Sequence, residues 1–163
     1  MPDYPVMFTV RDAVSGNGYL AGVTMFGRAV VCQEDDGKWW VYGVRPGAIA
    51  EYGDTPFDAF HKFRSRYKTL LFDIAEESED FEGFKNEVER FYNQPDHEEE
   101  DRWEAAFQAI RSGSLKVEPP FSELPRESPE KRPTGVFVQP LHQMKRFTAS
   151  DNVQETTELA AAA

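Results

Sequence analysis

Cysteine and histidine are scarce in this chain of 163 residues. Cys32 is the single cysteine, so no intrachain disulfide can form and no cysteine cluster can hold zinc. The three histidines, His61, His97 and His142, are widely separated and form no His-x-x-x-His or Glu-x-x-His spacing. We therefore expect no metal site and no histidine-based catalytic triad.

Long apolar runs are also missing. No stretch of about 18 apolar residues is present that could span a membrane. The first residues, Met1-Pro2-Asp3-Tyr4, lack the basic and then apolar layout of a signal peptide. We expect a soluble protein in the cytoplasm, with no membrane partner.

Sequence motifs for catalysis or cofactor binding are lacking as well. No Gly-x-Ser-x-Gly spacing occurs, and the glycine-rich segment 15–18 joins two predicted strands and opens no helix, so it is not a phosphate loop. Cys32 lies in an apolar strand and is expected in the core. We predict no catalytic residue and no cofactor. A nuclease site built from carboxylates on separate elements, such as Asp35 and Asp54, is an alternative that stays open.

Acidic residues dominate the charge, and they are concentrated in one segment. The formal net charge is −11. Residues 76–101 contain twelve Asp and Glu against Lys85 and Arg90, which gives −12 + 2 = −10 for this segment. Such a block repels phosphate, so direct nucleic-acid binding through it is not expected. It either attracts a basic partner or forms a solvated helical face.

The first fifty residues are typical of β-strands. β-branched and aromatic runs alternate with turn sequences such as Ser15-Gly16-Asn17-Gly18 and Asp35-Asp36-Gly37. Gly22 and Gly27 indicate a bulge or bend. Consecutive strands with tight turns favour an antiparallel meander. The predicted strands are 6–10, 19–26, 28–33, 38–44 and a short strand at 48–52.

A change from strand to helix is predicted at the corner Gly53-Asp54-Thr55-Pro56. Thr55 is a good N-cap, Pro56 suits the first helical position, and Asp58 stands three residues after the cap. Aromatic and aliphatic residues then recur at helical spacing. We predict a long helix over 56–76 that packs its apolar stripe on one face of the sheet.

Two shorter acidic helices are predicted at 80–93 and 97–112, the second capped by Asp96. Five prolines between 119 and 133 then mark a linker. The apolar islands 136–138 and 144–147 add an edge strand, dock as a peptide, or stay mobile. We expect an α+β domain at 1–116 with a sheet of three to five strands, and a linker and tail at 117–163. The alanine run 160–163 is left out of the predicted fold.

Trp39 and Trp40 are adjacent, so in a strand they face opposite sides of the sheet. One enters the core under the long helix. The other is covered by the chain's own tail or helices, or it marks a contact surface together with its neighbour Tyr42. We take Trp39, Trp40, Tyr42 and Tyr52 as candidate partner-binding residues, and residues 53–56 as structural turn and cap residues.

Residues 28–74 resemble the HicB-like antitoxins. The matching features are Val30-Val31, the acidic turn 34–37, Trp39-Trp40-Val41, Pro46-Gly47 and Gly53-Asp54-Thr55. The resemblance implies a β-β-β-α core, about 28–76, of a kind that in such antitoxins covers a small, basic, RNA-cleaving toxin. It implies a non-catalytic protein-binding module for this chain.

The function expected from the sequence is therefore binding or neutralising a basic partner protein. The first alternative is a self-associating structural or accessory protein, such as a homodimer that pairs sheets and buries the second tryptophan. The second alternative is the metal-dependent nuclease described above.

Overall fold

The computed structural model describes residues 1–141 and 156–162. His142 and the apolar island 144–147 lie outside the described residues. Among the described residues, no helix has the length and the apolar character that a membrane span requires.

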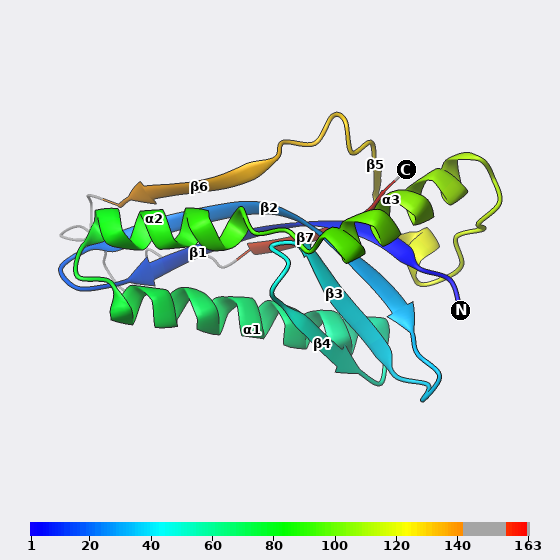
Figure 1. The fold of residues 1–163 in the computed structure, drawn as a ribbon, viewed down its shortest axis with the longest axis horizontal. Helices are drawn as coiled ribbons and strands as arrows, with labels where there is room; N and C mark the ends of the chain where they lie inside the picture. Colours follow the sequence, from blue (N-terminus) through cyan, green and yellow to red (C-terminus); the bar gives the residue numbers. More distant parts are fainter. Residues whose placement is uncertain (142–155, 163) are drawn as a thin grey trace.

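The chain alternates a β-rich beginning, a helical middle and a return to strands (Figure 1). Its first strands are β1 Tyr4–Ser15, β2 Leu20–Gln33, β3 Trp39–Arg45 and β4 Ala50–Gly53. The helices are α1 Pro56–Glu77, α2 Phe81–Tyr92 and α3 His97–Arg111, followed by the 3-10 helix Phe121–Glu123. The last strands are β5 Arg126–Glu127, β6 Gly135–Pro140 and β7 Thr156–Ala162.

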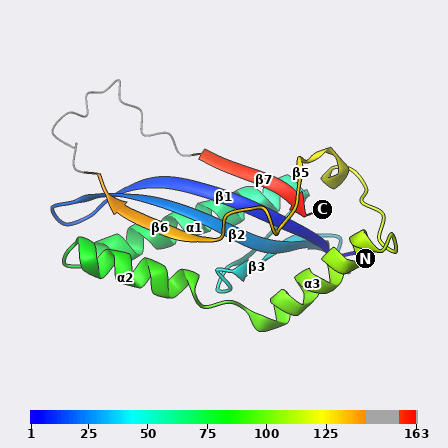
Figure 2. The same cartoon turned by 90° about the horizontal axis from the view of Figure 1, so that it is seen from above.

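The seven strands of the described residues belong to one sheet, in which six follow the order β4-β3-β2-β1-β7-β5 and β6 pairs with β2 off this path. Strand β2 has two partners along the same edge: β6 pairs with residues 21–26, and β3 pairs with residues 28–33. Figure 2 shows β7, β1, β2 and β6 side by side. Every pairing is antiparallel except that of β5 with β7. The α+β class is confirmed, and the sheet is larger than the predicted three to five strands.

The two strands predicted at 19–26 and 28–33 are one continuous strand, β2. Gly27 does not break it. A Cβ at this position would lie 2.4 Å from the Phe8 ring and 2.8 Å from the carbonyl oxygen of Arg45. The glycine therefore allows close approach, and the irregularity predicted nearby appears as a register shift between Arg28 and Ala29 where β3 pairs.

The strand-to-helix corner has the predicted chemistry. Thr55 Oγ1 accepts the backbone N–H of Asp58 at 3.0 Å, and Asp58 Oδ2 accepts the N–H of Asp54 at 3.1 Å. Pro56 occupies the first position of α1. Asp80 and Asp96 cap α2 and α3 by accepting backbone N–H groups. These caps fix where each helix starts.

Helices pack on both faces of the sheet. Val6 and Phe8 of β1 belong to the larger apolar cluster, which includes Phe63 of α1 and Phe84 of α2. Because side chains alternate along a strand, Met7 points the other way. It belongs to a second cluster, with Val30, Val44, Trp103, Phe107 and Ala162. Helices α1 and α2 therefore cover one face, and α3 covers part of the other.

The segment after α3 contributes to this fold. Phe121 is buried and stacks on Tyr4 with ring centroids 4.1 Å apart. The apolar island 136–138 forms part of β6. Of the three alternatives for this island, the structure therefore has the one in which it adds a strand to the sheet. The alanine run, left out of the predicted fold, belongs to it: Ala160, Ala161 and Ala162 are buried in β7. Small side chains suit a strand packed against other elements on both faces.

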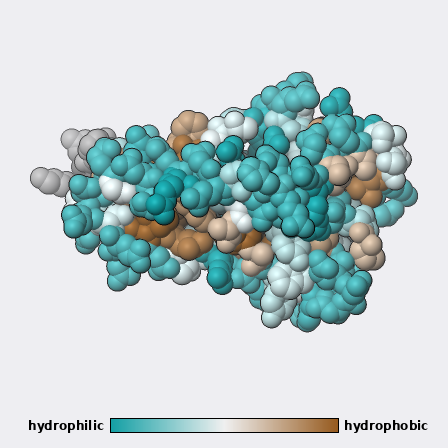
Figure 3. All heavy atoms as spheres, in the orientation of Figure 1, coloured by the Kyte–Doolittle hydropathy of each residue, from teal (hydrophilic) through white to brown (hydrophobic). Residues whose placement is uncertain are grey.

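The surface is mainly hydrophilic on the face shown in Figure 3, with apolar side chains along the seam between α1 and α2. Tyr67 and Phe91 meet across this seam with ring centroids 6.4 Å apart.

Candidate functional site

Three aromatic side chains form a row at the β4 end of the sheet, on the face that also carries α3. Trp40 stacks on Tyr42 of the same strand, with ring centroids 5.5 Å apart, and contacts Tyr52 of β4 at 4.9 Å. Trp40 and Tyr52 are directly paired across the two strands. Tyr52 is 48% exposed. We call Trp40, Tyr42 and Tyr52 the aromatic platform.

Trp39 lies on the opposite face, as the alternation predicts. It is partly buried, packs against the larger apolar cluster and contacts Phe121 with centroids 5.8 Å apart. Of the four aromatic residues proposed from the sequence, Trp39 thus belongs to the core side, and the other three come together on the platform.

Arg102 of α3 fixes one end of the platform. Its guanidinium carbon lies 5.2 Å from the centroid of the Tyr42 ring. It donates to both carboxylate oxygens of Asp3, at 2.7 and 3.2 Å, and to Glu99 at 3.0 and 3.1 Å. Bidentate contacts of this kind hold the side chain in one orientation. The N-terminal segment, α3 and β3 are therefore tied together beside the platform.

Cys32 and Glu34 complete this polar cluster. Arg102 also donates to Cys32 Sγ at 3.4 Å, and the Tyr42 hydroxyl donates to Glu34 at 3.0 Å. Burial raises the pKa of the Cys32 thiol to about 11, although Arg102 acts in the opposite direction. Burial, followed by the bond to Glu34, raises the pKa of Tyr42. Both groups are neutral at physiological pH and act as structural members of the cluster.

An acidic groove adjoins the platform. It has a volume of about 260 Å³ and is lined by Tyr42, Gly43, residues 47–50, Asp96 and Glu99. Asp96 accepts the N–H groups of Glu98 and Glu99 at the start of α3. Burial raises the pKa of Glu99, and Arg102 opposes that effect. The groove therefore combines an aromatic wall with two carboxyl groups.

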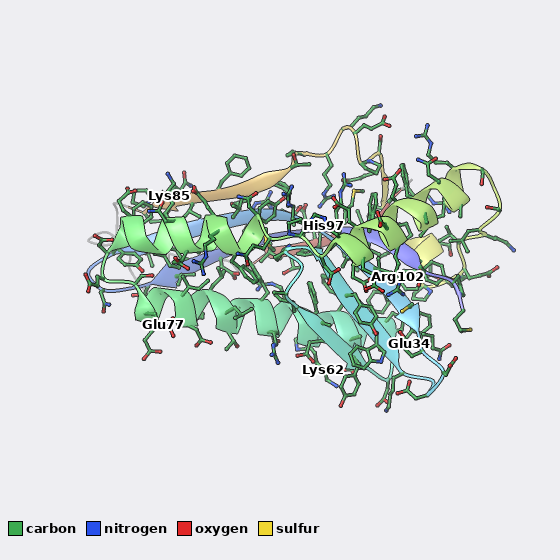
Figure 4. All side chains as sticks on the ribbon, in the orientation of Figure 1. Glu34, Lys62, Glu77, Lys85, His97 and Arg102 are labelled. Atoms are coloured by element: carbon green, nitrogen blue, oxygen red, sulfur yellow. The ribbon has the colours of Figure 1, made fainter. Side chains whose placement is uncertain are left out.

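Strand β4 is the end strand of the sheet, and its outer edge pairs with no strand among residues 1–141 and 156–162. Lys62 of α1 lies near Tyr52, with Nζ 5.8 Å from the ring centroid. Figure 4 labels Arg102, Glu34 and Lys62 around this end of the sheet. An open edge beside exposed aromatic rings is a surface on which an extended peptide can add a strand.

The corner residues predicted to be structural have structural contacts. Gly53 is buried, and a Cβ there would lie 2.6 Å from the backbone nitrogen of Ala59. Asp54 forms an ion pair with Lys38, which lowers the pKa of Asp54. Asp35 lies exposed in the β2–β3 turn.

In the part of the chain that the structure describes, no three His, Cys, Asp or Glu side chains gather as they would to hold a metal ion. His97 contacts Glu100, with Nδ1 3.4 Å from Oε2, and His61 is exposed on α1.

Comparison with protein-family models, with curated proteins and with solved structures gives no match in any of the three. The class that can be stated is therefore that of the fold: an α+β protein with a seven-stranded sheet and helices on both faces.

Arg102 and the groove carboxylates Asp96 and Glu99 were not singled out as partner-binding residues from the sequence. The sequence indicated Asp96 as a helix cap and Glu99 as part of the acidic block, whose helices were expected to contact a partner without any residue being singled out; it did not favour a cation site in the cluster 96–101. The sequence signal for them is weak. Glu99 and Arg102 stand three residues apart on one helix, which indicates an ion pair but not its position beside β3.

Proposed function

We propose that this protein is a non-catalytic binding module that holds a basic segment of a partner protein on the aromatic platform and the adjoining acidic groove. The observation that carries the proposal is the exposed Tyr52 on an end strand, in ring contact with Trp40, next to a groove walled by Asp96 and Glu99.

The chemistry of the surface supports a cationic ligand. The faces of Trp and Tyr rings attract Lys and Arg side chains. The negative charge of the groove favours the same ligand, while Glu99 keeps its pairing with Arg102 and Asp96 its place as the cap of α3. The surrounding charge acts in the same direction, since the segment 76–101 carries −10 of the net charge of −11. Such a field speeds the encounter with a basic protein and repels nucleic acid.

The geometry of β4 supports binding in an extended form. The backbone of a partner strand hydrogen-bonds to the outer edge of Ala50–Gly53, and alternate side chains of that strand reach the platform. The resemblance of residues 28–74 to HicB-like antitoxins favours the same class of partner, a small basic protein.

Self-association is the second candidate, and the same open edge favours it. Two copies would pair their β4 strands around a twofold axis and bury both Tyr52 side chains. Sedimentation at increasing concentration separates the two candidates: a stable homodimer whose formation is lost in Tyr52→Ala supports self-association.

Affinity capture from the cells of origin at low salt, followed by titration calorimetry with the purified partner, tests the main proposal. Tyr52→Ala and Trp40→Ala are each expected to weaken binding by about 2 kcal/mol, or about 30-fold, as for aromatic residues at the centre of an interface. Raising the salt concentration tenfold should weaken binding of the unmodified protein about tenfold.

Phe72→Ala is the matched control, because Phe72 is also an exposed aromatic residue but lies on α1, away from the platform. The Phe72→Ala variant should bind the partner with the same affinity as the unmodified protein. Equal affinity for Tyr52→Ala, Trp40→Ala and Phe72→Ala would refute the proposed surface.

A further inference from the structure

A second cleft lies where strand β2 changes partner. Strand β6 pairs with β2 up to Phe26, β3 pairs from Arg28 onward, and the two partners diverge at Gly27. The Tyr92 hydroxyl joins the two sides of this fork by donating to the carbonyl oxygen of Phe26 at 2.8 Å and accepting the N–H of Gly135 at 3.0 Å. The cleft has a volume of about 170 Å³ and is lined by Phe26, Arg28, Val44, Arg45, Tyr92, Glu100 and Thr134.

Two arginines, Arg28 and Arg45, line this cleft. Arg28 and Arg45 occupy directly paired positions of β2 and β3. Like charges placed opposite each other on neighbouring strands are destabilising. Within residues 1–141 and 156–162, neither guanidinium forms an ion pair or a hydrogen bond, and Arg45 Nε is buried without an acceptor. Two arginines at paired strand positions are unexpected in a chain whose net charge is −11.

Aromatic rings hold both guanidinium groups in place. The Cζ atom of Arg28 lies 4.3 Å from the centroid of the Trp103 ring, and that of Arg45 lies 5.4 Å from the centroid of Tyr92. A guanidinium stacked on a ring keeps its N–H donors in its own plane, where they can meet two oxygens of one anion. The donors are thus positioned in advance of binding.

Among the described residues, the other charged side chains around the cleft form no ion pair with the two arginines. Glu100 lines the cleft from α3, but its contact is with His97. Arg132, in the loop that leads to β6, is paired with Glu127 and with the hydroxyl of Thr9. Thr134 adds a hydroxyl group to the lining. The cleft therefore has two guanidinium groups without a carboxylate partner among the described residues, together with one carboxylate and a hydroxyl.

We propose that this fork cleft is a binding site for a small oxyanion, either a phosphate group or a carboxylate group, that Arg28 and Arg45 hold between them. The site is separate from the platform and does not depend on the proposed partner. The segment 94–96 lies between the fork cleft and the acidic groove. The N–H of Asp96 donates to the carbonyl oxygen of Val44 at 3.0 Å, and the N–H of Gly47 donates to the carbonyl oxygen of Gln94 at 3.1 Å.

NMR titration of the full chain with inorganic phosphate, and separately with acetate, tests the site at constant ionic strength in chloride. The Nε–Hε signals of Arg28 and Arg45 should shift and saturate with one anion per chain. Saturation with phosphate alone identifies a phosphate ligand, and saturation with acetate alone identifies a carboxylate ligand.

Arg45→Gln should weaken binding about tenfold, the value of one charge-assisted hydrogen bond. Arg11→Gln, an exposed arginine paired with Glu158, should leave it unchanged.

A second variant keeps the test valid if Arg45→Gln perturbs the fold. Glu100 is exposed, and Glu100→Gln removes the carboxylate that repels an anion, so binding should tighten about threefold. Glu98→Gln, an exposed neighbour on the same helix turn, should have no effect. The proposal is wrong if neither anion saturates the arginine signals, or if Glu100→Gln and Glu98→Gln give the same affinity as the unmodified protein.

Discussion

Arg102 connects parts of the chain that are far apart in sequence. Its contacts with Asp3, Glu99 and Cys32 join the N-terminal segment, α3 and β2. The guanidinium also lies over the Tyr42 ring, so the same side chain fixes one end of the aromatic platform. A platform held this firmly loses little conformational freedom when a partner binds, which favours affinity.

Cys32 is expected to be chemically inert in the folded protein. Burial raises the pKa of its thiol to about 11, so at pH 8 only about 0.1% is thiolate, the reactive form. Labelling by a disulfide reagent at pH 8 should be at least about 100-fold slower in the folded protein than in guanidinium chloride. The folded rate should still rise about tenfold per pH unit up to pH 10, whereas the unfolded rate levels off above pH 9.

If Cys32 is labelled at pH 8 nearly as fast in the folded protein as in the unfolded protein, the thiol is not buried as described. The measurement needs no variant, because the chain contains a single cysteine.

For single residues, rules based on neighbouring positions predicted which way a side chain points but not which distant residue it contacts. The alternation of side chains placed Trp39 and Trp40 on opposite faces, because it depends only on neighbouring residues. The contacts of Arg102 with Asp3, and of Trp40 with Tyr52, join residues that are distant in sequence. Which of several arginines or tyrosines meets a given strand depends on how the elements pack, and no spacing rule encodes that.

Helix α1 is attached to β1 by a buried ion pair between Arg64 and Asp12. The two side chains are only 12% and 2% exposed, and Arg64 Nε also donates to Thr157 of β7 at 2.7 Å. Burial, followed by the charge of Asp12, raises the pKa of the neighbouring Tyr67. One helix is thus joined to two strands through a single polar cluster.

Asp12→Ala should destabilise the fold by about 3–5 kcal/mol, because it leaves the Arg64 charge buried without its partner. Replacing both residues, as in Asp12→Leu with Arg64→Leu, should cost less than Asp12→Ala alone. Chemical denaturation followed by circular dichroism measures each free energy of unfolding.

The exposed pair Arg11–Glu158 provides the control, and Glu158→Ala should change stability by less than about 1 kcal/mol. If Asp12→Ala and Glu158→Ala lower the free energy of unfolding by similar amounts, the buried ion pair contributes no more to stability than the exposed one.

At the element scale, the helices were predictable and the later strands were not. The capping residues Thr55 and Asp96 and the helical spacing of apolar residues act within a few positions, so α1 and α3 begin at the predicted residues. Strands β5 and β7 are held by pairing with distant strands, and their sequences, Arg-Glu and a Thr-Thr-Glu-Leu segment that ends in alanines, have only a weak strand signal of their own.

At the scale of the whole molecule, the two proposed surfaces have different linings and adjoin through residues 94–96. The aromatic platform and acidic groove lie at the β4 end of the sheet, and the arginine cleft lies at the fork between β3 and β6. The two proposals together predict that a basic partner and a small anion bind at the same time. The sequence showed the acidic block but not the arginine pair, because Arg28 and Arg45 are brought together by strand register.

Hydrogen exchange of the protein, alone and saturated with its captured partner, tests the central claim most directly, since an added partner strand protects the amides it pairs with. The account predicts new protection at β4, residues 50–53, and at the first turn of α3, with α2 and the β1–β2 turn unchanged. Protection confined to α2 or to that turn, with the amides of β4 exchanging as in the free protein, would contradict the account.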